Sequence, residues 1–161
     1  RYLAKVDAGL IAKLPFNSAY EALIMASIVE KETGQASERP EIAGVFVRRL
    51  NKNMRLETDP TVIYGLGEQY KGDLKRKHLH DRSNSYNTYR NKGLPPTPIA
   101  LAGREAINAT LNPQVGDTLY FVAKGDGSHY FSSTLAEHNR AVHEYQVSKR
   151  KKDYRSAPAS N

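Results

Sequence analysis

Apolar side chains recur at helical spacing in the first third of the chain. Met25, Ile28 and Val29 fall on one helical face, which predicts a helix with that face in the core. A Ser-x-x-Glu capping box precedes this pattern and a glycine follows it, so the helix is expected to run from about residue 19 to Gly34. A second helix is predicted after Ser37, from an apolar stripe that consists of Ile42, Val45, Phe46 and Leu50.

The middle of the chain predicts fewer regular elements. Asp59 and Pro60 have the residue types of a helix N-cap and a first helical residue, which predicts a short helix that ends near Tyr64. Residues 65–98 are rich in Gly, Asn, Ser, Pro and basic side chains, and this composition predicts a long, mostly irregular segment. Irregular segments of such length inside a compact domain are usually functional.

The last third of the chain predicts both helix and strand. Residues 99–111 have a helical pattern that ends before an Asn-Pro pair. Residues 118–123 and 128–133 have strand character on either side of a Gly-Asp-Gly turn, which predicts a β-hairpin. A second capping box, at residues 134–137, begins a final helix that is expected to reach about residue 149.

The order of these elements indicates the fold class. Helices followed by a hairpin and one more helix, without βαβ alternation, are typical of α+β domains in which helices pack with a small antiparallel sheet. A chain of 161 residues, 39% of them hydrophobic and 25% charged, fits a single globular domain. We expect the domain to occupy residues 1–150 and the basic residues 151–161 to be a disordered tail. No apolar run approaches the length of a membrane span.

The chain carries a formal net charge of +7 and contains no cysteine. The absence of cysteine excludes disulfides and cysteine nucleophiles. The positive charge suits an acidic partner, and both the stem-peptide carboxylates of peptidoglycan and nucleic acid meet that description. Basic clusters are also common on plain solvated surface. The two clusters are Lys71, Lys75, Arg76 and Lys77 in the middle of the chain, and Lys149, Arg150, Lys151, Lys152 and Arg155 near its end.

Two carboxylates stand at the end of the first predicted helix. Glu32 continues the apolar stripe, whereas Glu30 lies about 200° away, because two residues turn an α-helix by that amount. Low solvation and the negative end of the helix dipole both raise the pKa of a carboxyl at such a position. A carboxylic acid still protonated near neutral pH is the general acid that glycosidic-bond cleavage needs. The commoner alternative is a solvated surface glutamate, and periodicity favours Glu32 over Glu30 only slightly.

Several short runs then follow in a set order and spacing. Together with the Glu-Lys-Glu run at residues 30–32, they resemble the catalytic domain of the endolytic murein transglycosylases of the MltG or YceG type. The resemblance covers most of the chain, and the order of all the runs makes it specific where each run alone is weak. The runs are Ser37-Glu38-Arg39, residues 45–50, residues 54–65, Tyr86-Asn87-Thr88-Tyr89, residues 93–99, residues 120–123, residues 127–131 and Glu137-His138-Asn139.

The resemblance implies a lytic transglycosylase that cuts within peptidoglycan glycan strands, between N-acetylmuramic acid and N-acetylglucosamine, and leaves 1,6-anhydro ends. It implies that the second glutamate of the Glu-Lys-Glu run, Glu32, is catalytic and that no metal or other cofactor takes part. It also implies a single-pass anchor, expected in the full-length protein and not in this piece, that holds the domain at the periplasmic face of the inner membrane. There the protein would limit the length of nascent strands beside cell-wall synthases.

Eight further residues are candidates for substrate binding. Asp59 would stabilise developing positive charge, or else only cap a helix. Asn87 and Thr88 would bind acetamido groups, or else form a turn. Glu38 and Arg39 would pair beside the cleft and orient the catalytic acid, or else form an exposed ion pair. Three tyrosines would stack on sugar faces, or else belong to the core. The eight are Glu38, Arg39, Asp59, Tyr64, Tyr86, Asn87, Thr88 and Tyr89.

Four other positions need a separate interpretation. Glu30 is either a neighbour that raises the pKa of Glu32 or a surface residue, and His129 lies either on the substrate side of the hairpin or in a structural cross-strand pair. Glu57 stands where members of the family often carry Gln, and Thr97 stands where a small residue such as Gly is common. These two departures concern fine substrate preference and not the reaction.

Three other functions stay open from the sequence. His78, His80 and Asp81, with His129 or His138, would be the ligands of a metal enzyme, although their spacing is a weak signal. A nucleic-acid-binding module would account for the charge and the tyrosines, but no helix-turn-helix, RNA-recognition or zinc-finger signature is present, so nucleic acid is not the expected partner. The third alternative is a peptidoglycan-binding domain without activity.

Overall fold

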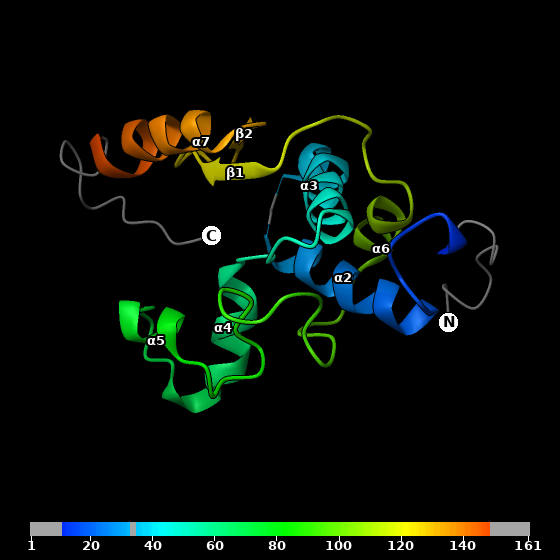
Figure 1. The fold of residues 1–161 in the computed structure, drawn as a ribbon, viewed down its shortest axis with the longest axis horizontal. Coiled ribbons are helices and arrows are strands. Elements are labelled where there is room, and N and C mark those ends of the chain that lie inside the picture. The colour runs from blue at the N-terminus through cyan, green and yellow to red at the C-terminus, as the bar shows by residue number, and fades with distance from the viewer. Residues whose placement is uncertain (1–10, 33–34, 149–161) are drawn as a thin grey trace.

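The computed structural model describes residues 11–32 and 35–148, and Figure 1 shows their arrangement. Three helices form the centre of the fold: α2 (Ala19–Glu32), α3 (Arg39–Asn51) and α6 (Arg104–Leu111). They pack against one another, and their apolar side chains make up most of the core. With the hairpin described below they form an α+β domain, which confirms the predicted fold class.

The first helix begins where its capping box predicts. The Ser18 hydroxyl accepts a hydrogen bond from the backbone N–H of Glu21 at 3.3 Å, and the Glu21 carboxylate accepts one from the N–H of Asn17 at 2.8 Å. The return bond of the box therefore reaches one residue further back than in its usual form. Helix α2 is described as far as Glu32, and its predicted end at Gly34 lies outside the described residues.

Helix α3 follows a short 3-10 helix, η2 (Ala36–Glu38), and carries Pro40 in its first turn, where a proline is tolerated. Its apolar stripe is in the core: Ile42, Val45 and Phe46 are fully buried, and Leu50 packs against the core from its edge. Because α2 and α3 lie side by side, the end of α2 is covered by apolar surface from its neighbour.

The predicted hairpin is present and slightly shorter than expected. Strand β1 (Tyr120–Ala123) pairs with β2 (His129–Ser132) in antiparallel register, with Phe121 opposite Phe131. Both glycines of the connecting turn have a positive φ, +96° and +94°, a conformation that other residues rarely adopt. The Phe121 ring meets the ring of Phe46 edge-on at 5.7 Å, so the hairpin is fixed to α3.

The last helix begins at the second capping box, which is complete. Helix α7 (Leu135–Val142) then passes into a π-helical stretch, η4 (His143–Ser148), which the periodicity does not predict. The basic tail over residues 151–161, predicted to be disordered, lies outside the described residues.

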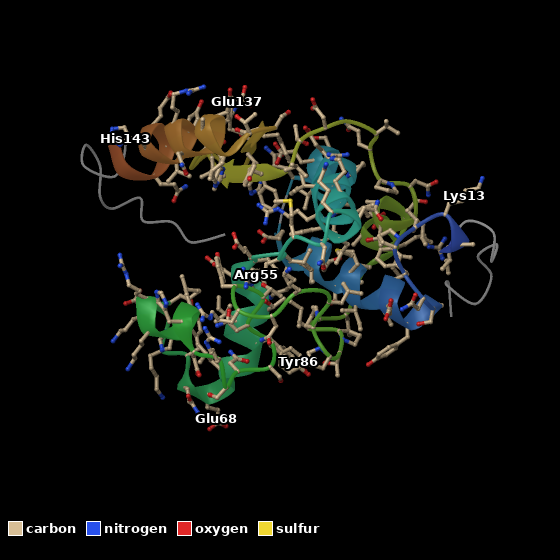
Figure 2. The ribbon with its side chains drawn as sticks, viewed as in Figure 1. Lys13, Arg55, Glu68, Tyr86, Glu137 and His143 are labelled. Carbon is tan, nitrogen blue, oxygen red and sulfur yellow. The ribbon has the colours of Figure 1, made fainter. Side chains whose placement is uncertain are left out.

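The middle of the chain departs from prediction in detail. Helix α4 (Asp59–Leu66) has Thr58 as its N-cap, so the assignment of Asp59 to that position is wrong by one residue. The long segment after it is mostly irregular, as predicted, but it includes a 3-10 helix, η3 (Gly67–Gln69), and the short helix α5 (Arg76–His80). Figure 2 shows the side chains of this segment, from Glu68 on η3 to Tyr86.

Helix α6 begins at Arg104, whereas the sequence predicts a start near residue 99. Two hydrogen bonds to α2 explain the late start. The N–H of Ile99 donates to the Ser27 hydroxyl at 3.0 Å, and the N–H of Gly103 donates to the Glu30 carboxylate at 2.9 Å. These bonds hold residues 99–103 against α2 in a non-helical path. Within the described parts of the chain, no helix is both long and apolar enough to cross a membrane.

Candidate active site

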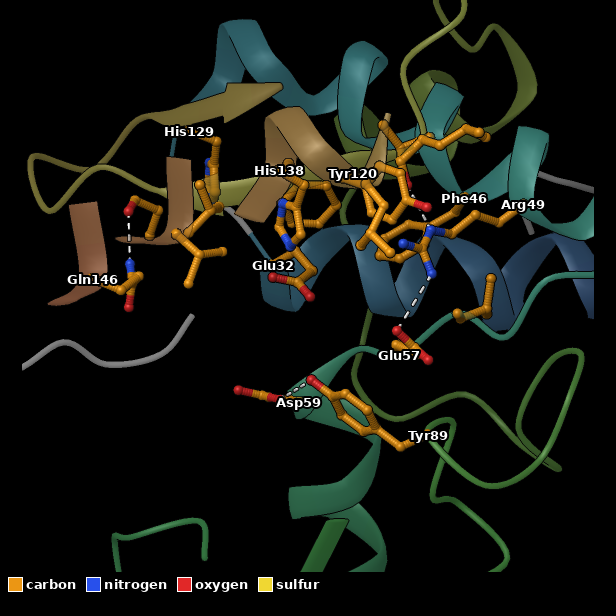
Figure 3. A pocket seen from close by; sticks show the side chains of 18 residues that line it. Glu32, Phe46, Arg49, Glu57, Asp59, Tyr89, Tyr120, His129, His138 and Gln146 are labelled. Carbon is orange, nitrogen blue, oxygen red and sulfur yellow. Dashed lines mark hydrogen bonds and ion pairs between the residues drawn. The ribbon is translucent and has the colours of Figure 1, made fainter. Parts of the chain in front are cut away.

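A cavity of about 330 Å³ opens between the end of α2, the hairpin, α7 and the turn that precedes α4. Figure 3 shows its labelled side chains. Glu32 lies in its floor, Asp59 and Tyr89 on one side, and Tyr120 and His138 on the opposite side. Segments that are far apart in the sequence therefore meet around the carboxyl group of one glutamate.

Glu32 is the last described residue of α2, and only 8% of it is exposed. The Thr58 hydroxyl donates a hydrogen bond to Oε2 of Glu32 at 2.5 Å. Burial raises the pKa of Glu32 from 4.5 to about 7; the hydrogen bond from Thr58 opposes this rise, and the nearby charge of Asp59 adds to it. The group is thus a carboxylic acid that can hold its proton near neutral pH and also release it.

A buried network of hydroxyl groups holds Thr58 in place. The backbone N–H of Thr58 donates to the Thr88 hydroxyl at 2.9 Å, and the hydroxyls of Thr61 and Thr88 are 3.0 Å apart. The Thr61 hydroxyl also donates to the carbonyl of Thr58 at 2.9 Å. All three side chains are buried, so this network fixes the donor that Glu32 receives.

Asp59 and Tyr89 form the second polar pair of the cavity. The phenol of Tyr89 donates to Oδ1 of Asp59 at 2.6 Å. Burial, together with the neighbouring charge of Asp59, raises the pKa of Tyr89 far above its ordinary value, so the phenol stays protonated and remains a donor. The chain turns sharply just before this pair, at Glu57, where φ is +52°.

Arg49 and two aromatic rings form a wall on the other side of the cavity. The Arg49 guanidinium is largely buried; its Nε donates to the carbonyl of Leu119 at 2.6 Å, and its charge is 3.9 Å from Glu57. It lies 4.9 Å from the centre of the Tyr120 ring, and the His138 ring is stacked with Tyr120 at 5.0 Å. No local sequence pattern predicts this wall, although Tyr120 and His138 lie in runs that resemble the family.

Glu30 lies on another face of α2 and does not line the cavity. Its carboxylate accepts the N–H of Gly103, as described above. The acidic neighbour that raises the pKa of Glu32 is Asp59, so the first of the two alternatives for Glu30 is wrong. The role of Glu30 in the fold is to hold the loop that leads into α6.

Glu38 pairs with His129, whereas the sequence predicts that it pairs with Arg39. Its two carboxylate oxygens accept the backbone N–H of His129 at 3.0 Å and the ring Nδ1 at 2.8 Å. In the described part of the chain, no ion pair joins Glu38 to Arg39, and the Nε of Arg39 is buried without a hydrogen-bond partner. His129 lines the cavity, so the carboxylate that was expected beside the catalytic acid instead orients an imidazole of the hairpin.

The remaining predicted residues lie outside the cavity lining. Tyr64 is 47% exposed and its ring is 5.0 Å from that of Tyr86, whose hydroxyl is 2.7 Å from that of Thr97. Asn87 is fully buried, and its amide donates to the carbonyls of three residues between 78 and 81 at 2.9 to 3.2 Å. In this conformation neither Asn87 nor Thr88 is accessible to a ligand, whereas Tyr64 is.

Two side chains of the metal alternative, those of His78 and Asp81, have other partners. Nδ1 of His78 accepts the backbone N–H of Lys75, and Asp81 accepts from the N–H and the hydroxyl of Ser83. His129 and His138 lie in the cavity instead, on different elements. Over residues 11–32 and 35–148, no three His, Cys, Asp or Glu side chains are grouped so that they could hold a metal ion.

Comparisons with known proteins agree on one family. The model of the YceG-like family matches residues 2–144. The chain is 45% identical over 135 residues to a protein of Bacillus subtilis strain 168 named endolytic murein transglycosylase. The match covers 84% of this chain and 37% of that protein. A protein of the same name from Streptococcus pneumoniae D39 is 35% identical over 133 residues, which are 80% of this chain and 24% of that protein. A crystal structure of a YceG-like protein from Listeria monocytogenes aligns with a TM-score of 0.72 at 48% identity, over 77% of this chain and 40% of the other.

Proposed function

Because the chain belongs to the YceG-like family, we propose that it is the catalytic domain of an endolytic lytic transglycosylase. Its substrate would be a peptidoglycan glycan strand, cut between N-acetylmuramic acid and N-acetylglucosamine. The observation that carries the proposal is a buried glutamic acid, Glu32, whose pKa of about 7 lets it act in turn as acid and base. The chain spans less than two fifths of its named relatives, so the activity is proposed for the domain and not transferred from whole proteins.

The reaction needs one proton donor and no water. Glu32 gives its proton to the glycosidic oxygen, and the bond from that oxygen to the anomeric carbon breaks. The 6-hydroxyl oxygen of the same muramic residue then bonds to the anomeric carbon and yields its proton to the Glu32 carboxylate. The acid is restored, one strand ends in 1,6-anhydro-muramic acid, and the other gains a hydroxyl. The intramolecular attack is favoured because both groups belong to one sugar.

Thr58 directs the proton of the acid. Since its hydroxyl donates to Oε2, that oxygen is the carbonyl oxygen of the neutral carboxyl, and the proton resides on Oε1. The buried threonine network fixes this arrangement before substrate arrives. Preorganised donors of this kind stabilise one protonation geometry without reorganisation during the reaction.

Asp59 supplies the negative charge that the transition state needs. Positive charge develops at the anomeric carbon as the glycosidic bond breaks. Asp59 is close enough to Glu32 to raise its pKa, and Tyr89 holds the Asp59 carboxylate in place. The same charge therefore both keeps Glu32 protonated and stabilises the sugar cation.

The cellular setting is a separate part of the proposal and rests on family membership alone. We propose that the full-length protein is a single-pass membrane protein whose catalytic domain faces the periplasmic side of the inner membrane. There it would cut nascent strands close to the synthases that make them and so limit strand length.

The decisive experiment is mass analysis of the products released from intact glycan strands by the wild-type chain and by Glu32→Gln. We expect internal fragments that end in 1,6-anhydro-muramic acid with the wild type and none with the variant. Glu30→Gln is the matched control, because it removes a carboxylate two residues away and outside the cavity. Reducing ends in place of anhydro ends would show a hydrolase, and anhydro products that survive Glu32→Gln would exclude Glu32 as the acid.

A further inference from the structure

Helix α7 turns one face toward the cavity, and the mechanism above does not use it. Leu135, His138 and Val142 are spaced by three and four residues, so they share a face of the helix, and all three line the cavity. Leu135 is 56% exposed, although it is a large aliphatic side chain that folding tends to bury. The face therefore presents one polar group between two aliphatic ones, in the same cavity as Glu32.

The imidazole of His138 is held in a fixed orientation. It is stacked with the Tyr120 ring at an angle of 21°, and the Arg49 guanidinium also lies over that ring. Figure 3 shows Tyr120 between His138 and Arg49, with His138 directed toward the part of the cavity where Glu32 lies. Because neighbours fix the ring, its cavity-facing nitrogen can serve as a preorganised binding group.

The surroundings of the ring decide which nitrogen carries the proton. Nδ1 of His138 is buried and has no hydrogen-bond partner among the described residues. A proton there would leave a buried N–H unpaired, which is costly, so the proton resides on Nε2 and is available to the cavity. Burial and the charge of Arg49 lower the pKa of His138, so the ring is neutral at neutral pH. His138 is thus an uncharged hydrogen-bond donor.

His129 has the opposite arrangement in the same cavity. Its Nδ1 faces the Glu38 carboxylate, which can only accept, so Nδ1 carries a proton, and the tautomer with its proton there presents Nε2 as an acceptor. Asp59 and Glu57 are acceptors too, since both are carboxylates that line the cavity. Hydroxyl groups of a sugar, which donate well, thus have several partners here. The carbonyl oxygen of an N-acetyl substituent, in contrast, needs a hydrogen-bond donor, and the α7 face offers an uncharged one.

An uncharged donor between two aliphatic side chains fits an acetamido group, which combines a carbonyl oxygen with a methyl group. We propose that the face of α7 formed by Leu135, His138 and Val142 binds an N-acetyl group of the glycan. His138 donates to the carbonyl oxygen through Nε2–H, and the methyl group lies against Leu135, which is one helical turn away. The inference rests on the proposed function in one respect, namely that the ligand is an N-acetylated glycan.

The test compares glycan strands with the same strands after chemical de-N-acetylation, and re-acetylated strands serve as the substrate control. His138→Phe keeps a ring beside Tyr120 and removes the donor, whereas His138→Gln retains an N–H donor. We expect His138→Phe to raise KM on N-acetylated strands about threefold to tenfold, the range for one lost hydrogen bond, with a smaller change in kcat. On de-N-acetylated strands its KM should equal that of the wild type, and His138→Gln should recover part of the loss.

Leu135→Ser provides a second variant that does not threaten folding, since the side chain is already more than half exposed. We expect KM to rise about twofold to fivefold on N-acetylated strands only, because the methyl contact is lost. Leu101→Ser is its matched control: Leu101 is 97% exposed and does not line the cavity, so its KM should stay at the wild-type value. His143→Phe is the control for His138, since His143 is exposed and does not line the cavity.

Equal losses on both kinds of strand, or no loss on either, would overturn the assignment and leave His138 a structural role. A binding measurement separates this outcome from failure of the proposed reaction. Glu32→Gln should bind N-acetylated strands more tightly than de-N-acetylated ones by calorimetry, and adding His138→Phe should reduce the difference by about threefold to tenfold. If the wild type makes no anhydro ends but this preference persists, the acetamido site stands and the transglycosylase does not. If the preference is absent from Glu32→Gln, the site is wrong whatever the products are.

Discussion

The last turn of α2 carries two glutamates in contrasting surroundings. Glu32 is 8% exposed, lines the cavity and receives its hydrogen bond from a side-chain hydroxyl. Glu30 is partly exposed, lies outside the cavity and accepts a backbone N–H from the loop before α6. The two residues have the same chemistry and the same helix, and they differ only by the rotation of about 200° that separates them.

Burial is what makes an acid of Glu32, since it is the largest cause of the raised pKa of this residue. The carboxylate of Glu30 serves the fold, because it satisfies a backbone donor at the N-terminus of α6. A glutamate two positions away from the catalytic acid can thus be purely structural. Matched substitutions of Glu32 and Glu30 measure how completely the catalytic and structural roles are separated.

The largest expected effect is on activity. Glu32→Gln removes the cavity carboxyl whose pKa is raised to about 7, so we expect the rate of strand cleavage to fall by about a thousandfold or more, as for loss of a general acid. Glu30→Gln should keep the rate within about threefold of wild type, because the amide oxygen of glutamine can still accept the N–H of Gly103. Release of soluble fragments measures both variants. Comparable losses in the two would contradict the separation.

Part of this arrangement is readable from the sequence. Helical periodicity places Glu32 on the apolar face and Glu30 off it, and the capping boxes and turn glycines predict where α2, α7 and the hairpin begin. These signals are local, because each depends on residues a few positions apart. The resemblance to the family, and not periodicity, is what selects Glu32.

The partners of Glu32 could not be predicted, because they come from distant parts of the chain. Thr58 is 26 residues away from Glu32, and Arg49 contacts the carbonyl of Leu119 across 70 residues. Tertiary packing decides such contacts, and neither propensity nor spacing encodes them. The same holds for Glu38, which the sequence pairs with its neighbour Arg39 and the fold pairs with His129, 91 residues along the chain.

The second effect is on stability, and its sign follows from proton uptake. Between about pH 4.5 and 7 the unfolded chain releases the proton of Glu32 while the folded chain keeps it, so the free energy of unfolding falls as pH rises through this window. The loss amounts to about 3 kcal/mol and is complete above pH 7. Glu32→Gln has no such proton, so its free energy of unfolding should not show this loss. Relative to wild type, the free energy of unfolding of the variant should therefore rise by about 3 kcal/mol between pH 4 and pH 8.

Urea unfolding at those two pH values measures the change, and Glu30→Gln is again the control. Its unfolding free energy should follow that of wild type across the window, because the substitution leaves Glu32 unchanged. A Glu32→Gln profile parallel to wild type would mean that Glu32 ionises at the same pH in the folded and unfolded chains. Burial would then give Glu32 no advantage over Glu30 as an acid.

The smallest effects come from the two groups that adjust the pKa of Glu32 in opposite directions. The Thr58 hydroxyl lowers it and the Asp59 charge raises it, so Thr58→Val should move the alkaline limb of kcat to higher pH and Asp59→Asn to lower pH, each by less than about one pH unit. The Thr58 shift should be the larger, since its hydrogen bond is direct at 2.5 Å. Asp59→Asn will also lower the maximal kcat, because the charge that stabilises the sugar cation is lost. The pH at the midpoint of the limb does not depend on that maximal value. The pH dependence of kcat measures both shifts, and a limb that moves the same way in both variants would show that neither group acts on Glu32 as its geometry implies.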